Sequence, residues 1–298
     1  MLACPGMTVA LVTCRDWPLL TDDDRLLQRA LGRRGVATEP VLWDEPSIDW
    51  SRYAVSLIRS TWDYVRRLPD YLAWAERAGA RTRLENSASL VRWNTHKAYL
   101  ATLAERGVPV VPTVWLPAGA PAKLGPLLAA QGWPAGVLKP VVSAGAWETV
   151  RVDAHEVASG QAHLDRLLPG HELMLQPYLD SVAAEGELSA IFFDGAPSHA
   201  VRKLPAGGDF RVQPQHGGRV VPCPLDGELR AAGGRVLEAL ESSPLYARVD
   251  LLRDADGVLR LVELELVEPF LYFEGSGGAE ERLADLLVQR VAETEPGQ

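Results

Sequence analysis

Three carboxylates near the end of the chain stand at a spacing that could hold a divalent cation. Glu263 and Glu265 lie two residues apart in an apolar run, so a strand would project both from one face. Asp250 lies in the preceding apolar run, and the turn sequence 254–257 predicts a hairpin that sets it opposite the two glutamates. Gathered carboxylates repel unless a cation stands among them, and Mg²⁺ prefers such hard oxygen ligands. The solvated outer face of a hairpin would suit the same residues, and this segment alone leaves both interpretations open.

Two lysines could meet an anion. Lys139 ends the apolar run 136–139, where burying a cation is costly unless an anion compensates it. The following turn, Ser143-Ala144-Gly145-Ala146, could wrap phosphate oxygens with its backbone amides. Lys97 lies upstream in a predicted helix. The turn matches neither a P-loop nor GxGxxG, and most small-residue turns are only turns.

A further segment could hold the adenine ring of a nucleotide. The apolar run 173–175 leads to Gln176, Tyr178 and Leu179, and apolar walls with one hydrogen-bonding edge suit an adenine ring. A core strand followed by a loop has the same pattern.

Cations flank a glycine-bearing loop at 205–218, within a Gly/Pro-rich stretch that continues to residue 224. Lys203 precedes this loop and Arg211 lies inside it, so the loop could close over phosphates as a lid. An exposed mobile loop is the equal alternative.

Another group of polar residues follows an early buried strand. Arg59, Ser60, Trp62 and Asp63 come directly after the run 55–58, and open α/β sheets bind ligands beyond the carboxyl ends of their strands. An arginine there could clamp a substrate carboxylate with two hydrogen bonds. It could also form an ion pair with Asp63 that only supports the loop.

These residues need elements to position them, and the hydrophobic periodicity predicts an α/β framework. The first part alternates strands at 9–13, 40–43 and 55–58 with a helix capped by Thr21 and another opened by Pro69. A helix over 89–107 follows. From residue 187 onward strands dominate, so the later lobes are expected to be α+β.

Composition narrows the functional classes. The 298 residues are 47% hydrophobic with nine Trp, which favours a packed core, and the net charge of −9 argues against a nucleic-acid partner. No apolar run reaches the roughly 18 residues of a membrane span. Cys4, Cys14 and Cys223 form no CxxC pair, and no apolar segment precedes Cys4 as a secretion signal requires. We expect reduced thiols in a cytoplasmic protein.

Taken in chain order, the motifs resemble those of the ATP-grasp superfamily, and of its glutathione-synthetase-like branch in particular. Five segments are similar to the cycloserine synthetases, the cyclising members of that branch: Val91-Arg92-Trp93, Leu175-Gln176-Pro177-Tyr178, Phe193-Asp194-Gly195, Ser198-His199-Ala200 and Arg248-Val249-Asp250-Leu251. The resemblance implies an ATP-grasp fold with a pre-ATP-grasp α/β domain over 1–88. It also implies a central lobe from 89–133 and 181–298 that carries the carboxylates, and a small lobe over 134–180 that covers the nucleotide.

The resemblance also implies a role for each site residue. It assigns Lys97 and Lys139 to the α- and β-phosphates of ATP, with Ser143 and Gly145 in the loop beside them, and it assigns Lys203 and Arg211 to the γ-phosphate. Gln176, Tyr178 and Leu179 would line adenine, Glu187 would bind the ribose, and Arg248 would neutralise the phosphoryl group in transfer. Asp250, Glu263 and Glu265 would bind two Mg²⁺ ions (or Mn²⁺), and Arg59, Ser60, Trp62 and Asp63 would contact the substrate. Two departures leave metal preference and lid kinetics open: Glu265 replaces the family's Asn, and Ala146 replaces a glycine.

We therefore expect an ATP-dependent ligase that phosphorylates the carboxylate of a small amino-acid-like molecule and couples it to an amine. A cyclising synthetase acting within one such molecule is the alternative in this class. A non-catalytic ATP-binding regulatory protein, or a phosphotransferase without an acyl acceptor, are the other possibilities. The sequence leaves a homodimer open.

Overall fold

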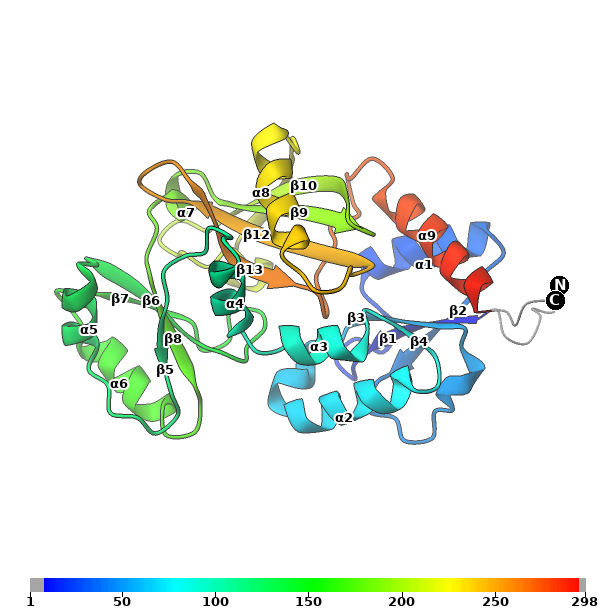
Figure 1. Cartoon of the computed structure of the whole chain (residues 1–298), viewed down its shortest axis with the longest axis horizontal. Coiled ribbons are helices and arrows are strands. Elements are labelled where there is room, and N and C mark those ends of the chain that lie inside the picture. The colour runs from blue at the N-terminus through cyan, green and yellow to red at the C-terminus, as the bar shows by residue number, and fades with distance from the viewer. Residues whose placement is uncertain (1–7, 295–298) are drawn as a thin grey trace.

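Three β-sheets with flanking helices make up the computed structural model, which describes residues 8–294 (Figure 1). The sheet of β1–β4 lies at one end, the sheet of β5–β8 at the other, and the sheet of β9–β13 between them. The predicted α/β class with additional α+β lobes is confirmed. Within residues 8–294, no helix combines the length and apolar character that a membrane span requires.

The first sheet is parallel and ordered β2-β1-β3-β4, and its two central strands, β1 and β3, are buried along almost their whole length. Thr21 caps the first helix as predicted, since its hydroxyl accepts a hydrogen bond from the backbone N–H of Asp24 at 3.1 Å. The elements of this lobe are β1 (Thr8–Thr13), α1 (Asp22–Arg33), β2 (Ala37–Leu42), β3 (Val55–Ser60), α2 (Leu68–Gly79) and β4 (Arg83–Glu85).

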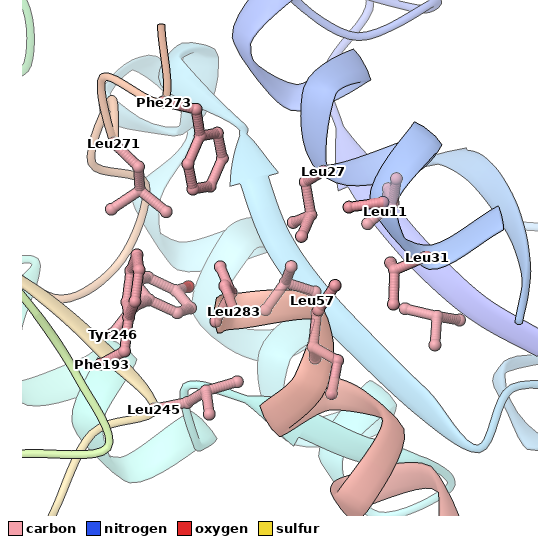
Figure 2. Packing of buried hydrophobic residues seen from close by; sticks show 14 of the residues in the cluster. Leu11, Leu27, Leu31, Leu57, Phe193, Leu245, Tyr246, Leu271, Phe273 and Leu283 are labelled. Carbon is pink, nitrogen blue, oxygen red and sulfur yellow. The ribbon is translucent and has the colours of Figure 1, made fainter. Parts of the chain in front are cut away.

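The last helix of the chain completes this first lobe, although it lies at the opposite end of the sequence. Leu283 of α9 (Ala279–Glu293) packs with Leu27 and Leu31 of α1 and with Leu57 of β3 in one hydrophobic core (Figure 2). Arg34 adds an ion pair to Asp285 of α9 at 2.7 Å.

The central sheet is antiparallel and ordered β11-β10-β9-β12-β13, with α4 and α8 beside it (Figure 1). Its last two strands form the predicted hairpin, closed by a turn in which Gly257 adopts φ +82°. The elements are α3 (Ala88–Asn94), α4 (Tyr99–Glu105), α7 (Ser181–Ala184), β9 (Glu187–Phe193), β10 (Ala196–Leu204), β11 (Arg219–Cys223), α8 (Gly227–Glu238), β12 (Tyr246–Arg253) and β13 (Leu259–Glu265).

The small sheet is ordered β5-β8-β6-β7 and is covered by two helices that share its core. Its pairing brings in β5 and α5, which the sequence analysis assigns to the central lobe, because β5 pairs with β8. The division into domains stays a proposal. The elements are β5 (Val114–Leu116), α5 (Leu124–Gln131), β6 (Ala135–Pro140), β7 (Val150–Asp153), α6 (Ala158–Leu167) and β8 (Leu173–Pro177).

Two expectations about individual elements are wrong. The helix expected over 89–107 is broken into α3 and α4, because the backbone N–H of Lys97 bonds to the carbonyl of Val141 at 3.0 Å instead of continuing the helix. The Gly/Pro-rich stretch 205–224 is not a loop throughout, because β11 pairs with β10 from Arg219 onward. Its first part contains no strand and has the bounds predicted for the glycine-bearing loop, 205–218.

Asn86 joins the first lobe to the central sheet. Its buried amide donates to the carbonyls of Tyr246 at 3.0 Å and Leu266 at 2.7 Å, and its carbonyl accepts from the N–H of Leu245 at 2.7 Å. Three buried backbone groups from two separate segments therefore depend on one side chain.

We predict that Asn86→Ala lowers the free energy of unfolding by about 2–4 kcal/mol, because it leaves those backbone groups without partners. Urea denaturation measures the change. The control is Gln131→Ala, which removes a similar amide from an exposed position at the end of α5 and should change stability by less than about 0.5 kcal/mol. Equal stability of the two variants would contradict the role of Asn86.

Candidate active site

A cavity of about 1360 Å³ opens between the three sheets, with walls from all three lobes. Most of the residues singled out in the sequence line it, although they come from segments far apart in the chain. These are Trp62, Lys97, Lys139, Ser143, Gly145, Gln176, Tyr178, Leu179, Glu187, Lys203, Arg211, Arg248, Asp250, Glu263 and Glu265.

The carboxylates of the hairpin meet cations across the central sheet. Strand register sets Asp250 opposite Glu263 and Arg248 opposite Glu265. Arg248 binds Asp250 through two nitrogens at 3.0 Å and also pairs with Glu265. Lys203, from β10, lies 3.1 Å from Asp250 and also pairs with Glu187. The predicted hairpin sets Asp250 opposite the glutamates, and lysine and arginine side chains lie among the three carboxylates.

Burial and pairing shift the acidity of these carboxylates in opposite directions. Burial alone would raise the pKa of Asp250, but Arg248 and Lys203 hold that pKa below its usual range. Glu263 also has a lowered pKa, because Lys97 and Lys139 outweigh its burial. Burial raises the pKa of Glu265 to about 7, and repulsion from Glu263 and Asp250 adds to the effect.

Lys97 and Lys139 differ in their partners. Lys97 donates to the carbonyl of Ser143 at 2.7 Å and lies 3.0 Å from Glu263. Lys139 is buried at 7% exposure and forms no hydrogen bond or ion pair to any described residue, and its burial lowers its pKa. A buried cation that lines a cavity without a direct ion pair is the arrangement expected where an anionic ligand binds.

The loop 143–146 and the loop 205–218 touch each other over the cavity. The amide of Gln215 donates to the carbonyl of Gly145 at 3.1 Å. Gly145 and Ala146 adopt φ of +60° and +59°, so the alanine occupies a left-handed conformation that favours glycine. Arg211 is held by Asp209 through nitrogen–oxygen distances of 2.8 to 3.2 Å, and the pairing lowers the pKa of Asp209.

Apolar side chains line one end of the cavity, where the sequence analysis expects adenine. Tyr178, Leu179 and Phe210 pack against a small cluster of buried Val182, Val212 and Leu252. At the same end, the Gln176 side chain is anchored by a 3.0 Å hydrogen bond to the Thr113 hydroxyl. Apolar walls with one hydrogen-bonding edge are the surroundings expected for adenine, and the role of these residues toward adenine stays a prediction.

The geometry supports the expected Mg²⁺ site only in part. Among residues 8–294, no group of three His, Cys, Asp or Glu side chains converges as a metal site requires. Asp250, Glu263 and Glu265 supply the hard oxygens that Mg²⁺ prefers, but each carboxylate is turned toward a lysine or arginine. The donor chemistry therefore fits, and the three oxygens are not assembled in advance. Cys14 and Cys223 are free thiols, and Cys4 lies outside the described residues.

The expected substrate clamp at the end of β3 is not in the cavity. Arg59, Ser60 and Asp63 are not among the described residues that line it. Arg59 is 2% exposed and donates to Asp24 and to the Pro269 carbonyl, both at 2.8 Å.

The other two residues are engaged in the protein as well. Ser60 also bonds to Asp24, while Asp63 accepts from Trp43 at 2.8 Å and pairs with Arg67 at 3.2 Å. The alternative in which Arg59 pairs with Asp63 is also wrong, because Asp24 takes that place.

Cavity residues that the sequence analysis misses lie beyond the carboxylates. Trp17 and Asp23 come from the first lobe, and Glu268, Phe270 and Tyr272 follow β13. One signal was available in the sequence: Glu268 stands three residues after Glu265 and before Pro269, at the carboxyl end of a strand. Trp17 and Asp23 carry no such signal.

Comparison with known proteins gives relatives over the whole chain. The family model of the D-cycloserine synthetase DcsG N-terminal domain matches residues 9–86. The cycloserine biosynthesis protein DcsG of Streptomyces lavendulae is 34% identical over 281 residues, which cover 86% of this chain and 90% of that protein. The crystal structure of D-cycloserine synthetase DcsG superposes with a TM-score of 0.86 at 33% identity, covering 95% of this chain and 99% of that one.

More distant structures share the fold alone. The ATP-grasp ligase PsnB, solved with a phosphomimetic variant of its minimal precursor, Mg and ADP, has a TM-score of 0.67 at 18% identity and covers 97% of this chain and 100% of its own. The D-alanine–D-alanine ligase of Bacillus anthracis, solved with ATP, has a TM-score of 0.63 at 13% identity and covers 96% and 98%. The predicted ATP-grasp fold and ligase class are confirmed. The chain therefore belongs to the D-cycloserine synthetase family of ATP-grasp ligases and is an ATP-dependent, C–N bond-forming enzyme.

Proposed function

We propose that this enzyme uses ATP to activate the carboxylate of one amino-acid-like molecule and closes it onto a nitrogen of the same molecule, giving D-cycloserine or a close analogue. The likeness to D-cycloserine synthetase carries the proposal, because it extends over 95% of this chain at a TM-score of 0.86. An ATP-dependent reaction fits the cytoplasmic location expected from the sequence.

The cations of the cavity would bind the nucleotide phosphates. Lys139 forms no direct ion pair within residues 8–294, so a phosphate oxygen beside it would compensate its buried charge. Lys97 donates a hydrogen bond to the carbonyl of Ser143, so Lys97 and the 143–146 loop lie together in the same cavity as Lys139. Arg211 would turn from Asp209 toward the γ-phosphate when the 205–218 loop closes.

Asp250, Glu263 and Glu265 would hold Mg²⁺, which neutralises phosphate charge when it is bound. In this structure, lysines and an arginine pair with these carboxylates. Binding of the nucleotide would exchange partners, with phosphates taking the cations. This exchange would keep the charges of these paired residues compensated.

The reaction would proceed in two balanced steps. A carboxylate oxygen of the substrate attacks the γ-phosphorus of ATP, ADP leaves, and an acyl phosphate forms. The substrate nitrogen then attacks the acyl carbon, loses a proton and expels inorganic phosphate, so that a ring amide forms. Arg248 and Lys203, both buried among carboxylates, would stabilise the phosphoryl group by position and charge, without a protein nucleophile.

A non-catalytic ATP-binding role has less support. Buried carboxylates and cations are costly to keep in a cavity, and a protein that only binds ATP has no need for Arg248 beside the carboxylates. Coupling of two separate molecules remains the alternative reaction, and product analysis separates it from ring closure.

The first prediction from this proposed function concerns the product. Opening the ring amide of D-cycloserine gives D-β-aminooxyalanine, so this amino acid and derivatives with a further group on the aminooxy nitrogen are the substrates to offer with ATP and Mg²⁺. We expect ADP release together with the mass of the cyclised product. A product with the mass of two joined molecules would contradict ring closure, and ADP release without any new C–N bond would contradict the proposal as a whole.

A second prediction concerns Lys139. Lys139→Met should weaken ATP binding by about 1.5–3 kcal/mol, the contribution of a charged hydrogen bond, which is roughly 10- to 150-fold in Kd. Calorimetric titration measures the affinity. Lys123→Met, at an exposed position before α5, is the control and should bind ATP as the wild type does. Unchanged affinity in Lys139→Met would remove this lysine from the nucleotide site.

A third prediction concerns the 205–218 loop. Trypsin should cut after Arg211 in the free enzyme, and a non-hydrolysable ATP analogue with Mg²⁺ should suppress this cut at least several-fold, because loop closure buries the bond. Mass spectrometry of the fragments identifies the site, and Arg211→Gln should abolish that fragment alone. Cleavage at equal rates with and without the analogue would make this an ordinary surface loop.

A further inference from the structure

Residues 266–273, here called the strap, follow β13 without belonging to a strand. Their backbone carbonyls are held by side chains from other parts of the fold instead of by a neighbouring strand. The donors are Asn86 to Leu266 (2.7 Å), Tyr246 to Val267 (2.8 Å), Trp62 to Glu268 (3.0 Å), Arg59 to Pro269 (2.8 Å), Arg248 to Phe270 (3.2 Å) and His199 to Leu271 (2.8 Å).

This anchoring fixes which side chains of the strap face the cavity. Glu268, Phe270 and Tyr272 line it, while Leu271 and Phe273 are buried in the core beneath (Figure 2). Asp23 adds a further anchor, since its carboxylate accepts from the N–H of Phe273 at 2.7 Å. The strap is therefore a fixed wall of the cavity, next to the phosphoryl-transfer residues because Arg248 contacts both.

Glu268 differs from the neighbouring buried carboxylates of the cavity. Its side chain is 6% exposed, yet it forms no ion pair with any described residue. Asp250, Glu263 and Glu265 each pair with a lysine or arginine. The Tyr64 hydroxyl beside Glu268 lowers the pKa of its carboxyl, but burial and repulsion from Glu265 raise that pKa to about 8.

Aromatic rings complete this end of the cavity. Trp62 and Phe270 stack with ring centroids 6.5 Å apart, Phe270 and Tyr272 lie 5.0 Å apart, and Trp17 meets Trp62 edge-on at 5.8 Å. Aromatic faces attract ammonium groups, and a buried carboxylate without a cation is costly unless a ligand supplies one. Both features favour a small organic cation.

We propose that Glu268 is the counter-ion for the substrate's ammonium group, with Trp62 and Phe270 as the walls that enclose it. The inference rests on the proposed function, because it identifies how the free amine of the amino-acid-like molecule is recognised. Glu268 is thus a specificity-determining residue for substrates that carry an amine beside the carboxylate to be activated.

Two ring compounds that differ only in the amine test the assignment. D-cycloserine carries a primary amine, and isoxazolidin-3-one is the same ring without it. With ADP and Mg²⁺ present, calorimetry should show that the wild-type enzyme binds D-cycloserine at least tenfold more tightly. In Glu268→Gln this preference should fall below about threefold. Glu274→Gln removes a carboxylate from the exposed mouth of the same cavity and should keep the wild-type preference.

Thermal unfolding separates recognition from a structural role. Without ligand and above about pH 8, where the Glu268 carboxyl is ionised, Glu268→Gln should melt at or above the wild-type temperature, because it removes a buried charge that lacks an ion pair. A drop of several degrees would overturn the proposal, since the carboxylate would then have a stabilising partner in the fold besides the Tyr64 hydroxyl, whose hydrogen bond a glutamine can still accept. A change in the Mg²⁺ dependence of ADP binding, with the amine preference intact, would assign Glu268 to the metal and also overturn it.

The remaining outcomes distinguish this inference from the proposed function. If the wild-type enzyme binds the two ring compounds equally while it still forms the cyclised product, Glu268 loses its role and the proposed function stands. If the wild-type enzyme binds neither compound and forms no cyclised product, both fail together.

Discussion

Buried charges that must be compensated are the constraint on which the site of this enzyme depends. Lys97, Lys203 and Arg248 enter the cavity from separate segments, and each finds a carboxylate of the central sheet there. Removing any one partner would leave an uncompensated charge in a poorly solvated cavity, which costs several kcal/mol. This network therefore orders the lysine and arginine side chains by pairing them with carboxylates. Under the proposed function, a ligand that carries both phosphates and a divalent cation would replace these pairs.

The framework keeps that network in register. Antiparallel pairing of β12 and β13 fixes the carboxylates relative to one another. Lys203 comes from β10, which is separated from β12 by the single strand β9. Beyond β13, regular pairing ends, and side-chain hydrogen bonds from both the first lobe and the central sheet hold the strap in place. Arg59 belongs to this second system: fully buried beside Tyr246, it bonds to Asp24 and to the strap carbonyl of Pro269. The first lobe thus shapes this end of the cavity by supporting the strap, and not through the arginine clamp that its sequence suggests.

Local patterns predicted the parts of the site that depend on local structure. The period-two spacing of Glu263 and Glu265, with a turn ending at Gly257, was sufficient to predict the hairpin. A lysine at the end of an apolar strand was sufficient to indicate a buried cation at Lys139. The order of these motifs predicted the ATP-grasp fold. The roles of individual residues toward ATP and Mg²⁺ remain predictions.

What the sequence could not predict depends on contacts between distant segments. Nothing near Arg59 in the chain indicates that its partners are Asp24 and the carbonyl of Pro269, which lies 210 positions away. The break between α3 and α4 has a similar cause, because the bond from Lys97 to Val141 competes with helix continuation. Pairing of β5 with β8 likewise moves residues 114–116 into the small sheet, although a helix separates them from the rest of it.

The central claim is that the paired charges of this cavity serve transfer of a phosphoryl group from ATP to a substrate carboxylate. Isotope tracing tests it most directly: a substrate labelled with ¹⁸O in its carboxylate is turned over, and the released phosphate is analysed by ³¹P NMR. Because the acyl phosphate retains a carboxylate oxygen and passes it to phosphate when the amide forms, one ¹⁸O per inorganic phosphate is predicted. Unlabelled phosphate accompanying formation of the product would contradict the account.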